Sequence, residues 1–423
     1  MYGRRSTRWF WALLPSNAAV GGAATLIPLY IVSPAVGGSV VHVGVILSAH
    51  NLALIPAALA WGVAVDSLGR RRPIIILSYA GMTGLLGLMY TTGSLGALMF
   101  EYAIFGFLAA GPGPVVSLLL METTPKASWA RMFGRLSSIS MAGVMLGSLP
   151  GIFWTWLFDL KSYFLLCSLY GLLALVMALR WVPEPPITLE RRALIHSPEG
   201  LAHRLLHLPL IFLKPPTLTD FRRFWRLLRG MVHELPLLYL FTLFFFMSGS
   251  TFFTSYTPFL VSRGVSESQT FLAHFLLSLI NTLTFIRAGT IVGRLGEGRS
   301  AKLAVAMRAL AMLGAAALAL RLEGVSLLMA TILMFAVIGA SFSIANTATS
   351  TLLFRTLGTS HQGELLGVQG ALTAAGLFTG ALLSGNLSHH FGYPLTFLTA
   401  GLLLLIALTI LHQFTRIAHR NPS

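Results

Sequence analysis

Long apolar runs dominate the chain, and mostly short polar stretches separate them. A helix needs about 20 mainly apolar residues to cross the hydrocarbon of a bilayer. The ten-residue alternation typical of a membrane β-barrel, the other fold that can span a bilayer, is absent from the sequence. We therefore expect an all-α polytopic membrane protein with twelve transmembrane helices. The predicted spans are 9–33, 40–65, 73–92, 95–121, 131–156, 162–182, 235–261, 268–292, 301–320, 325–353, 363–387 and 393–414.

Composition agrees with this pattern. Of the 423 residues, 55% are hydrophobic and only 10% are charged, which is more apolar surface than a soluble fold can bury. Three arginines precede the first run, as in a signal peptide, but no small-residue cleavage site follows, so we expect a retained first helix. The single Cys167 excludes an internal disulfide framework.

The distribution of Lys and Arg predicts the orientation. If the N-terminus is cytoplasmic, the inner segments hold 24 of the 29 basic residues, the outer segments hold Lys161, Arg263 and Arg321, and two lie within spans. Basic residues concentrate on the cytoplasmic side of membrane proteins. We therefore expect a multi-pass protein of the cell membrane with both termini cytoplasmic. The net charge of +16 is explained by topology, and no nucleic-acid partner is expected.

One long polar segment, 183–233, separates the sixth and seventh spans and predicts three parts: an N-terminal bundle 1–182, a basic cytoplasmic linker 183–233 and a C-terminal bundle 234–423. Within the linker, apolar residues at helical spacing lie opposite four arginines. Such a helix can lie on the inner leaflet with its arginines among anionic lipid headgroups. A solvated linker helix is the alternative. The apolar residues are Phe221, Phe224, Trp225, Leu228 and Val232, and the arginines are Arg222, Arg223, Arg226 and Arg229.

Glycines recur at a constant offset and predict two related halves. Four glycines in the fourth and fifth spans reappear 233 positions later, in the tenth and eleventh. Glycines four apart allow helices to pack closely, so this repeat predicts two pseudo-symmetric six-helix bundles. The pairs are Gly106 and Gly339, Gly134 and Gly367, Gly143 and Gly376, and Gly147 and Gly380.

A glycine- and arginine-rich motif joins the second and third spans. It reads Gly62-Val-Ala-Val-Asp66-Ser-Leu-Gly69-Arg70-Arg71-Arg72-Pro73. A partial second copy follows 227 positions later, with Gly289, Gly296 and Arg299 in place of Gly62, Gly69 and Arg72, and with Gly293 where Asp66 would fall. In a chain of six plus six spans, this motif resembles that of the major facilitator superfamily of secondary carriers. The resemblance covers essentially the whole chain.

The resemblance implies a gating role for the first motif. In the family, the corresponding Asp holds the cytoplasmic ends of helices 2 and 11 together when the carrier faces outward, so Asp66 and Arg70 would take that role here. An Asp at the membrane edge can also meet the positive end of a neighbouring helix. A solvated Asp in a basic loop is the alternative.

The repeat suggests a second set of gating charges. Glu122 and Arg131 flank the loop between spans 4 and 5, and the equivalent positions are Arg355 and Glu364, with the signs exchanged. Opposite charges at helix ends suit salt bridges that form in one state and break in the other. Coincidence is the alternative, because cytoplasmic loops are generally charged.

The resemblance also places the substrate cavity at the bilayer midplane, where polar residues are costly and hence candidates for function. His50 suits substrate or proton binding because histidine titrates near physiological pH, or it is hydrogen-bonded to a neighbouring helix. Glu101 suits proton binding, or it reaches the outer surface. The full set of candidates is Asn17, His50, Asn51, Glu101, Arg135, Tyr256, His274, Asn281, Asn346 and Gln369.

Two arginines within spans, Arg287 and Arg308, are expected to extend their side chains to the inner interface. The seventh span is rich in aromatic residues around Ser248–Thr251, which favours a hydrophobic or amphipathic cargo even though most of these rings should serve packing. The aromatic residues are Phe241, Phe244, Phe245, Phe246, Phe252, Phe253 and Tyr256.

These patterns together predict a monomeric secondary transporter that moves a small molecule by alternating access, as a proton-coupled antiporter that exports its cargo. The alternatives are an uptake carrier for a small polar metabolite and, less favoured, an intramembrane enzyme or a channel. The sequence contains no H-E-x-x-H pattern and no nucleotide-binding motif. We expect no catalytic residue, no metal and no cofactor beyond a coupling proton.

Overall fold

The computed structural model describes residues 8–68, 70–123, 129–184, 235–356 and 362–418. Within these ranges, twelve helical stretches are long and apolar enough to cross a membrane, and no β-strand occurs. This confirms the predicted all-α fold with twelve spans. The linker 183–233 and its amphipathic helix fall almost wholly outside the described residues, so the three-part division stays a prediction.

The helices fall into two sets, one on each side of residues 185–234. The first set is η1 (Arg8–Ala12), α1 (Leu13–Val32), α2 (Val40–Leu68), α3 (Arg72–Thr91), α4 (Leu95–Ala109), α5 (Pro112–Thr123), α6 (Trp129–Ser148), α7 (Gly151–Leu157), η3 (Leu160–Ser162) and α8 (Tyr163–Trp181). The second set is α12 (Leu235–Ser262), α13 (Glu267–Leu295), α14 (Glu297–Leu318), α15 (Gly324–Thr356), α16 (Gln362–Phe391) and α17 (Tyr393–Ala418).

Two spans of the first set are interrupted, although the sequence analysis expected continuous helices there. The fourth span divides into α4 and α5 before Pro112, and the fifth divides into α6 and α7 at Pro150. Proline lacks the backbone N–H that would continue the hydrogen-bond ladder, and its ring displaces the preceding turn. The equivalent helices α15 and α16 have no such interruption because the repeat places Ala345 and Leu383 at these positions.

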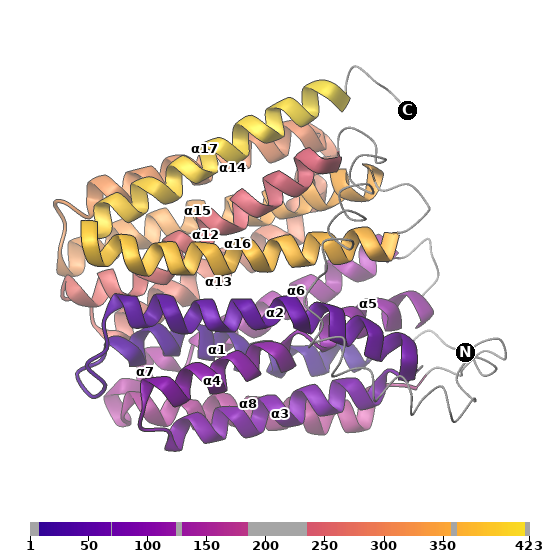
Figure 1. Ribbon diagram of the computed structural model, residues 1–423, viewed down its shortest axis with the longest axis horizontal. Coiled ribbons are helices and arrows are strands. Elements are labelled where there is room, and N and C mark those ends of the chain that lie inside the picture. The colour runs from indigo at the N-terminus through magenta and orange to yellow at the C-terminus, as the bar shows by residue number, and fades with distance from the viewer. Residues whose placement is uncertain (1–7, 69, 124–128, 185–234, 357–361, 419–423) are drawn as a thin grey trace, which may run out of the picture.

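The two sets form two bundles that lie against each other along nearly parallel helices. In Figure 1, the indigo-to-magenta bundle lies below the orange-to-yellow one, and α2 runs beside α16 along their boundary. Each bundle has its own apolar core, one built mainly from residues 9–182 and the other from residues 235–414. Helices α1 and α12 contribute many of their small and aromatic residues to these cores.

The glycine repeat appears in the structure as repeated packing. A β-carbon at Gly106 of α4 would lie 2.9 Å from the carbonyl oxygen of His50 in α2, and one at Gly339 of α15 would lie 2.9 Å from that of Leu277 in α13. Leu277 is 227 positions after His50, the offset of the two motif copies. The same helix pairs therefore approach through glycine in both halves.

The helices α6 and α16 repeat the pattern against α1 and α12. Gly147 packs on the carbonyl oxygen of Ala18, and Gly380 packs on that of Met247, with no room for a β-carbon at either glycine. Met247 follows Ala18 by 229 positions. These contacts relate the two halves residue by residue, at offsets of 227 to 233 positions that define equivalent residues.

The two bundles together have two ends, because their helices run nearly parallel. We call the end at which α1 begins and α17 ends the terminal end, and the opposite end the distal end (Figure 1). At the distal end the two bundles touch closely. A β-carbon at Gly44 would lie 2.8 Å from the α-carbon of Gly385, and the hydroxyls of Thr155 and Ser268 are 2.7 Å apart. The distal end is therefore closed in this structure.

Candidate substrate cavity

A cavity of about 470 Å³ lies between the two bundles. Residues of α1, α2, α4 and α6 form one side, and residues of α12 to α16 form the other. Its polar lining residues are Thr25, His50, Asn51, Tyr102, Ser250, Thr254, Thr257, His274, Ser278, Asn281 and Arg308. Its aromatic wall is Phe245, Phe246, Phe253 and Phe342. No carboxylate is among its lining residues in the described part of the chain.

His50 is held in place by α4 and also faces the cavity. Its Nδ1 is 3.1 Å from the carbonyl oxygen of Tyr102, and the imidazole stacks on the Tyr102 ring with centroids 4.1 Å apart. Gly106, one turn further along α4, allows this close approach. Both sequence-based interpretations of His50 therefore describe part of its position: it contacts a neighbouring helix, and it lines the cavity.

His274 occupies the opposite side of the cavity, on α13. Its Nε2 is 3.1 Å from the hydroxyl oxygen of Thr257, and its ring meets the edge of Phe335 with centroids 5.6 Å apart. Which of the two atoms donates in the first contact depends on the tautomer of the imidazole. The cavity thus has one histidine from each half.

Two asparagines of the cavity connect the halves. The Asn51 amide donates to the carbonyl oxygen of Leu377 at 3.2 Å, joining α2 to α16. The Asn281 amide approaches the Met141 sulfur at 3.9 Å, joining α13 to α6, while its Oδ1 accepts a hydrogen bond from the Ser343 hydroxyl. These bonds cross the surface along which the bundles would have to move.

Arg308 of α14 is the one Lys, Arg, Asp or Glu among the described residues that line the cavity. Its side chain is only 4% exposed, and its guanidinium carbon lies 5.1 Å from the ring centroids of both Phe245 and Phe342. Within the described part of the chain, neither its Nε nor its Nη1 has a hydrogen-bond partner. The expectation that Arg308 extends to the inner interface is wrong, because α14 turns this position toward α12 and α15. Arg287, by contrast, is exposed.

Four predicted candidates lie on helices of the bundles but do not line the cavity. Asn17 donates to the Leu13 carbonyl oxygen of its own helix at 2.8 Å. The Tyr256 hydroxyl lies 2.9 Å from that of Thr331, inside the core of the C-terminal bundle. Asn346 and Gln369 are half-buried and lie outside the lining set.

Arg135 and Glu101 also lie away from the cavity. Arg135 is exposed. Glu101 lies near the start of α4, where its Oε1 accepts a hydrogen bond from the Thr92 hydroxyl at 2.6 Å, while its buried Oε2 has no partner among the described residues. The structure thus places Glu101 toward the distal end rather than at the centre of the bundle.

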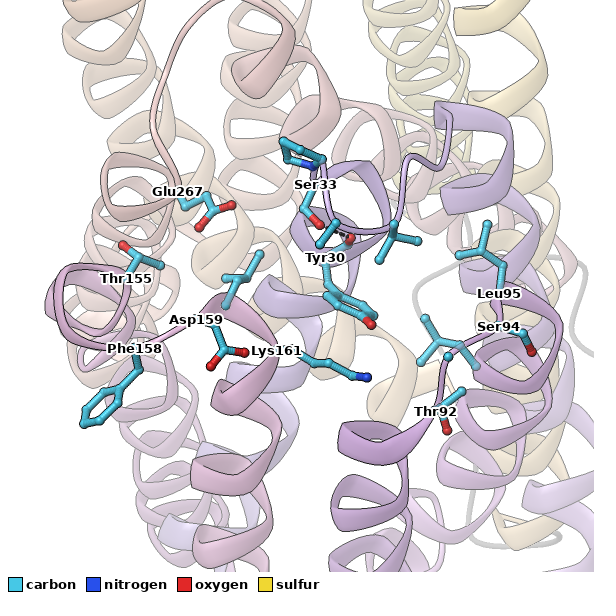
Figure 2. Close-up of a pocket in the computed structure, with 16 residues that line it drawn as sticks. Tyr30, Ser33, Thr92, Ser94, Leu95, Thr155, Phe158, Asp159, Lys161 and Glu267 are labelled. Carbon is cyan, nitrogen blue, oxygen red and sulfur yellow. Dashed lines mark hydrogen bonds between the residues drawn. The ribbon is translucent and has the colours of Figure 1, made fainter.

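A second pocket, of about 700 Å³, opens at the distal end beside Thr92. Figure 2 shows Asp159, Lys161 and Tyr30 among its lining residues. Almost all of its lining comes from the N-terminal bundle, with Glu267 as the exception. Since a carrier site has to be shared by both halves to be exposed to each side in turn, the central cavity is the better candidate.

The basic motif is tied to its own bundle. The backbone amides of Arg71 and Arg72 donate to the Glu184 carboxylate at 2.8 and 3.3 Å, and the Arg72 guanidinium donates to the carbonyl oxygen of Leu179 at the end of α8. Arg70 is exposed. The surroundings of Gly62, Asp66 and Gly69 lie outside the described residues, so the gating role of Asp66 stays a prediction.

The second set of gating charges is partly described. Arg355 forms a two-point salt bridge with Glu297 at the start of α14, at 2.9 and 3.1 Å. The side chains of Glu122, Arg131 and Glu364 lie outside the described residues, so the exchange of signs remains untested. Gly296, which follows α13 and precedes α14, has φ +81°, so it joins the two helices in a conformation that L residues rarely adopt.

Sequence reasoning missed several lining residues of the cavity, among them Thr25, Thr254, Thr257, Ser278 and Phe342. It also missed or misplaced three further residues. Tyr102 lies one turn before Gly106 on α4. Gly106 is the glycine through which α4 approaches α2, and it could have pointed to Tyr102. Arg308 was placed within a span but expected to extend to the inner interface. Glu184 is the first acid after the sixth span, and a search for the partner of the basic triplet would have found it.

The fold and cavity agree with comparisons to known proteins. The sequence matches the family described as Major Facilitator Superfamily over residues 10–373. The chain belongs to the major facilitator superfamily. This confirms the resemblance drawn from the motif between α2 and α3.

Individual relatives are more distant. A match to the multi-drug resistance efflux pump PmrA of Streptococcus pneumoniae is 25% identical over 187 residues, covering 43% of this chain and 46% of the pump, less than half the length of that relative. The crystal structure of the human organic anion transporter MFSD10 (TETRAN) aligns with TM-score 0.65 at 19% identity, covering 96% of this chain and 99% of that one.

Two further solved structures share the fold over nearly the whole of this chain. The nucleoside transporter NupG aligns with TM-score 0.70 at 12% identity, covering 97% of this chain and 99% of that one. A structure of proton dependent oligopeptide transporters aligns with TM-score 0.75 at 14% identity, covering 99% of each chain.

Proposed function

We propose that this chain is a secondary transporter of the cell membrane that exports an amphipathic small molecule by alternating access, in exchange for protons. The cavity shared by the two bundles carries this proposal. A site between two pseudo-symmetric bundles is exposed to one side and then the other when the bundles rock against each other. Closure at the distal end, through Gly44 and Gly385 and through Thr155 and Ser268, fits one of the two end states.

The lining supports the class of cargo. Pockets for drug-sized molecules measure about 300–1,000 Å³ and are mostly apolar with a few fixed polar groups, and this cavity of about 470 Å³ meets both conditions. Four phenylalanines form its apolar wall. The partial match to a multi-drug resistance efflux pump supports export as the direction.

The orientation and assembly proposed here follow the basic residues. Among the described residues, most Lys and Arg lie toward the terminal end, which would be cytoplasmic, with anionic inner-leaflet lipids as its partners. The distal end, with Lys161, Arg263 and Arg321, would face outward. A monomer contains the whole cavity, since both of its sides come from one chain.

A reversible cross-link at the distal end tests alternating access. The hydroxyls of Thr155 and Ser268 are 2.7 Å apart, so cysteines at both positions are close enough for a disulfide. The one native cysteine, Cys167, is buried. In proteoliposomes, oxidation of the double variant Thr155→Cys/Ser268→Cys should abolish cargo flux, and reduction should restore it. The two single variants are the controls, and undiminished flux in the oxidised double variant would contradict the proposal.

Proton coupling needs a separate test at the histidines of the cavity. We propose that His50 takes up the coupling proton, because it faces the cavity from the N-terminal half. His50→Gln should remove the acceleration of flux by an imposed pH gradient while cargo exchange without a gradient continues. His412→Gln, at an exposed position of α17, is the matched control. If His50→Gln still responds to the gradient and Glu101→Gln does not, the coupling residue is Glu101 instead.

A further inference from the structure

The guanidinium of Arg308 is surrounded by protein at the middle of a membrane span. Arg308 lies near the centre of the 22-residue helix α14, and its side chain is 4% exposed. It does not reach either end of the bundle, since Phe245 and Phe342 enclose the guanidinium from two sides at 5.1 Å each. A charge at this depth is expensive, and arginines in such positions are normally paired.

No such pairing occurs in the part of the chain that the structure describes. The Nε and Nη1 groups of Arg308 are buried without hydrogen-bond partners, and no carboxylate lines the cavity. The two aromatic faces attract the cation, but they accept no conventional hydrogen bond from its N–H groups. The site thus has unsatisfied donors and an uncompensated positive charge beside a cavity large enough for a small molecule.

The surroundings of Arg308 are particular to the C-terminal half. A β-carbon at Gly249 of α12 would lie 3.2 Å from Nη2, so glycine leaves room for the guanidinium there. The offsets between the halves give no such arrangement in the N-terminal bundle. The positions equivalent to Arg308, Gly249, Phe245 and Phe342 are Gly81, Val20, Ser16 and Ala109.

We propose that Arg308 is the oxyanion-binding residue of the cavity, and that the cargo is an amphipathic organic anion. Its carboxylate, sulfonate or phosphate accepts hydrogen bonds from the planar fork of the guanidinium, a geometry that suits two-oxygen groups. Its apolar body lies against Phe246 and Phe253. This inference names the cargo class of the cavity and so depends on the proposed function.

Matched probes that differ only in charge test the inference. Purified full-length protein is titrated by calorimetry with naphthalene-2-carboxylate and naphthalene-2-sulfonate, with the neutral naphthalene-2-carboxamide and with naphthalen-2-ylmethylammonium. A lost hydrogen bond to a charged group changes affinity by about tenfold or more. Wild type should therefore bind both anions at least about tenfold more tightly than the amide.

Variants of the arginine assign that preference to its side chain. Arg308→Gln should lose the preference for anions while amide binding stays unchanged. Arg308→Lys, which keeps the charge but not the planar fork, should retain part of the preference and serves as the second variant if Arg308→Gln fails to fold. Arg287→Gln removes an exposed arginine from a neighbouring span and should leave all four affinities unchanged.

Two results would overturn the inference: anions binding no more tightly than the amide, or an anion preference that survives in Arg308→Gln. Flux in proteoliposomes separates this failure from failure of the proposed function. If the amide or the amine is preferred and its flux is still blocked by the Thr155–Ser268 cross-link, the transporter proposal stands and the anion site does not. If anions bind through Arg308 but no probe shows cross-link-sensitive flux, the anion site stands and the transporter proposal does not.

Discussion

The two halves of the chain share a backbone plan and differ in what they bring to the cavity between them. Gly106 and Gly339 pack on equivalent carbonyl oxygens of α2 and α13, and the same holds for Gly147 and Gly380 against α1 and α12. The cavity lining does not follow this symmetry. The N-terminal half supplies His50, Asn51, Tyr102 and small residues, whereas the C-terminal half supplies the guanidinium and all four phenylalanines.

The contrast is sharpest at Gly81 and Arg308, which the repeat makes equivalent. A β-carbon at Gly81 would lie 2.5 Å from the Leu108 side chain, so α3 packs directly on α4 there. In the other half, Arg308 fills the corresponding region between α12 and α15. The glycine contacts thus repeat in both halves, whereas the residues that line the cavity differ between them.

The largest expected effect comes from disturbing the shared packing, and it should be equal in both halves. Gly147→Val and Gly380→Val each place a branched side chain against backbone with no space for it. Overpacking a core costs about 1–3 kcal/mol, and a backbone clash lies at the upper end. Both variants should strongly lower the melting temperature of the purified protein.

Gly134→Val in α6 and Gly370→Val in α16 are the controls for this pair. Both glycines lie on exposed faces with nothing within 4 Å of an added β-carbon. They share the cost of placing a β-branched residue in a helix, so they isolate the packing contribution. A large loss at only one of Gly147 and Gly380 would break the symmetry argued above.

The next effect should appear in one half only. Gly249→Val adds a side chain beside Nη2 of Arg308 and displaces the guanidinium. Affinity for naphthalene-2-sulfonate should then fall about tenfold, the loss expected for one charged hydrogen bond. Val20→Ala changes the equivalent position of the N-terminal half and should leave this affinity unchanged. Equal losses of affinity in the two variants would show that the effect comes from general destabilisation of the helix packing and not from the position of the guanidinium.

The sequence predicted the scaffold better than the lining, and the reason is geometric. Hydropathy locates a residue along the membrane normal, and on that basis the sequence predicts His50, Asn51, His274 and Asn281 at depth; all four line the cavity. It does not say which way a helix turns a residue. Arg308 was therefore assigned to the lipid interface, although α14 turns it inward between two aromatic rings.

The same limitation explains the candidates that proved to lie elsewhere. Tyr256 satisfies its hydroxyl inside a core, and Asn17 satisfies its amide within its own helix. A polar residue at depth can be satisfied locally or can face a cavity, and one sequence does not distinguish the two. The aromatic span α12 shows the same division, since Phe246 and Phe253 line the cavity whereas Phe252 is buried in the core.

A smaller effect is expected from the aromatic residues around Arg308. Phe245→Leu and Phe342→Leu each remove one of the two ring faces next to the guanidinium. A single cation–π contact contributes about 0.5–1 kcal/mol at the lower end of its range, and the other ring still faces the guanidinium in each variant, so anion affinity should fall by about twofold to fivefold. Phe259→Leu truncates a buried phenylalanine of α12, the helix of Phe245, that does not line the cavity. It should lower thermal stability without changing anion affinity, and a change in affinity there would contradict a local role for the two rings.

The smallest effect concerns the bonds that join the halves. Asn51 donates to the Leu377 carbonyl oxygen across the boundary, and the same oxygen also accepts from Ser250 within the C-terminal half. Asn51→Ala therefore removes a contact between the halves without leaving the acceptor unpaired.

A neutral hydrogen bond contributes about 1 kcal/mol, which corresponds to about a fivefold shift in a two-state population. A cysteine at Thr155, half-buried against Ser268 in the closed distal end, should react about fivefold faster with a membrane-impermeant maleimide when Asn51→Ala is added. Asn17→Ala is the matched control, because its bond to Leu13 lies within α1 and persists in both states. Equal rates in the two variants would mean that the Asn51 bond does not favour the closed distal end, and that the glycine contacts near Gly44 and Gly385 hold it closed without help from the cavity.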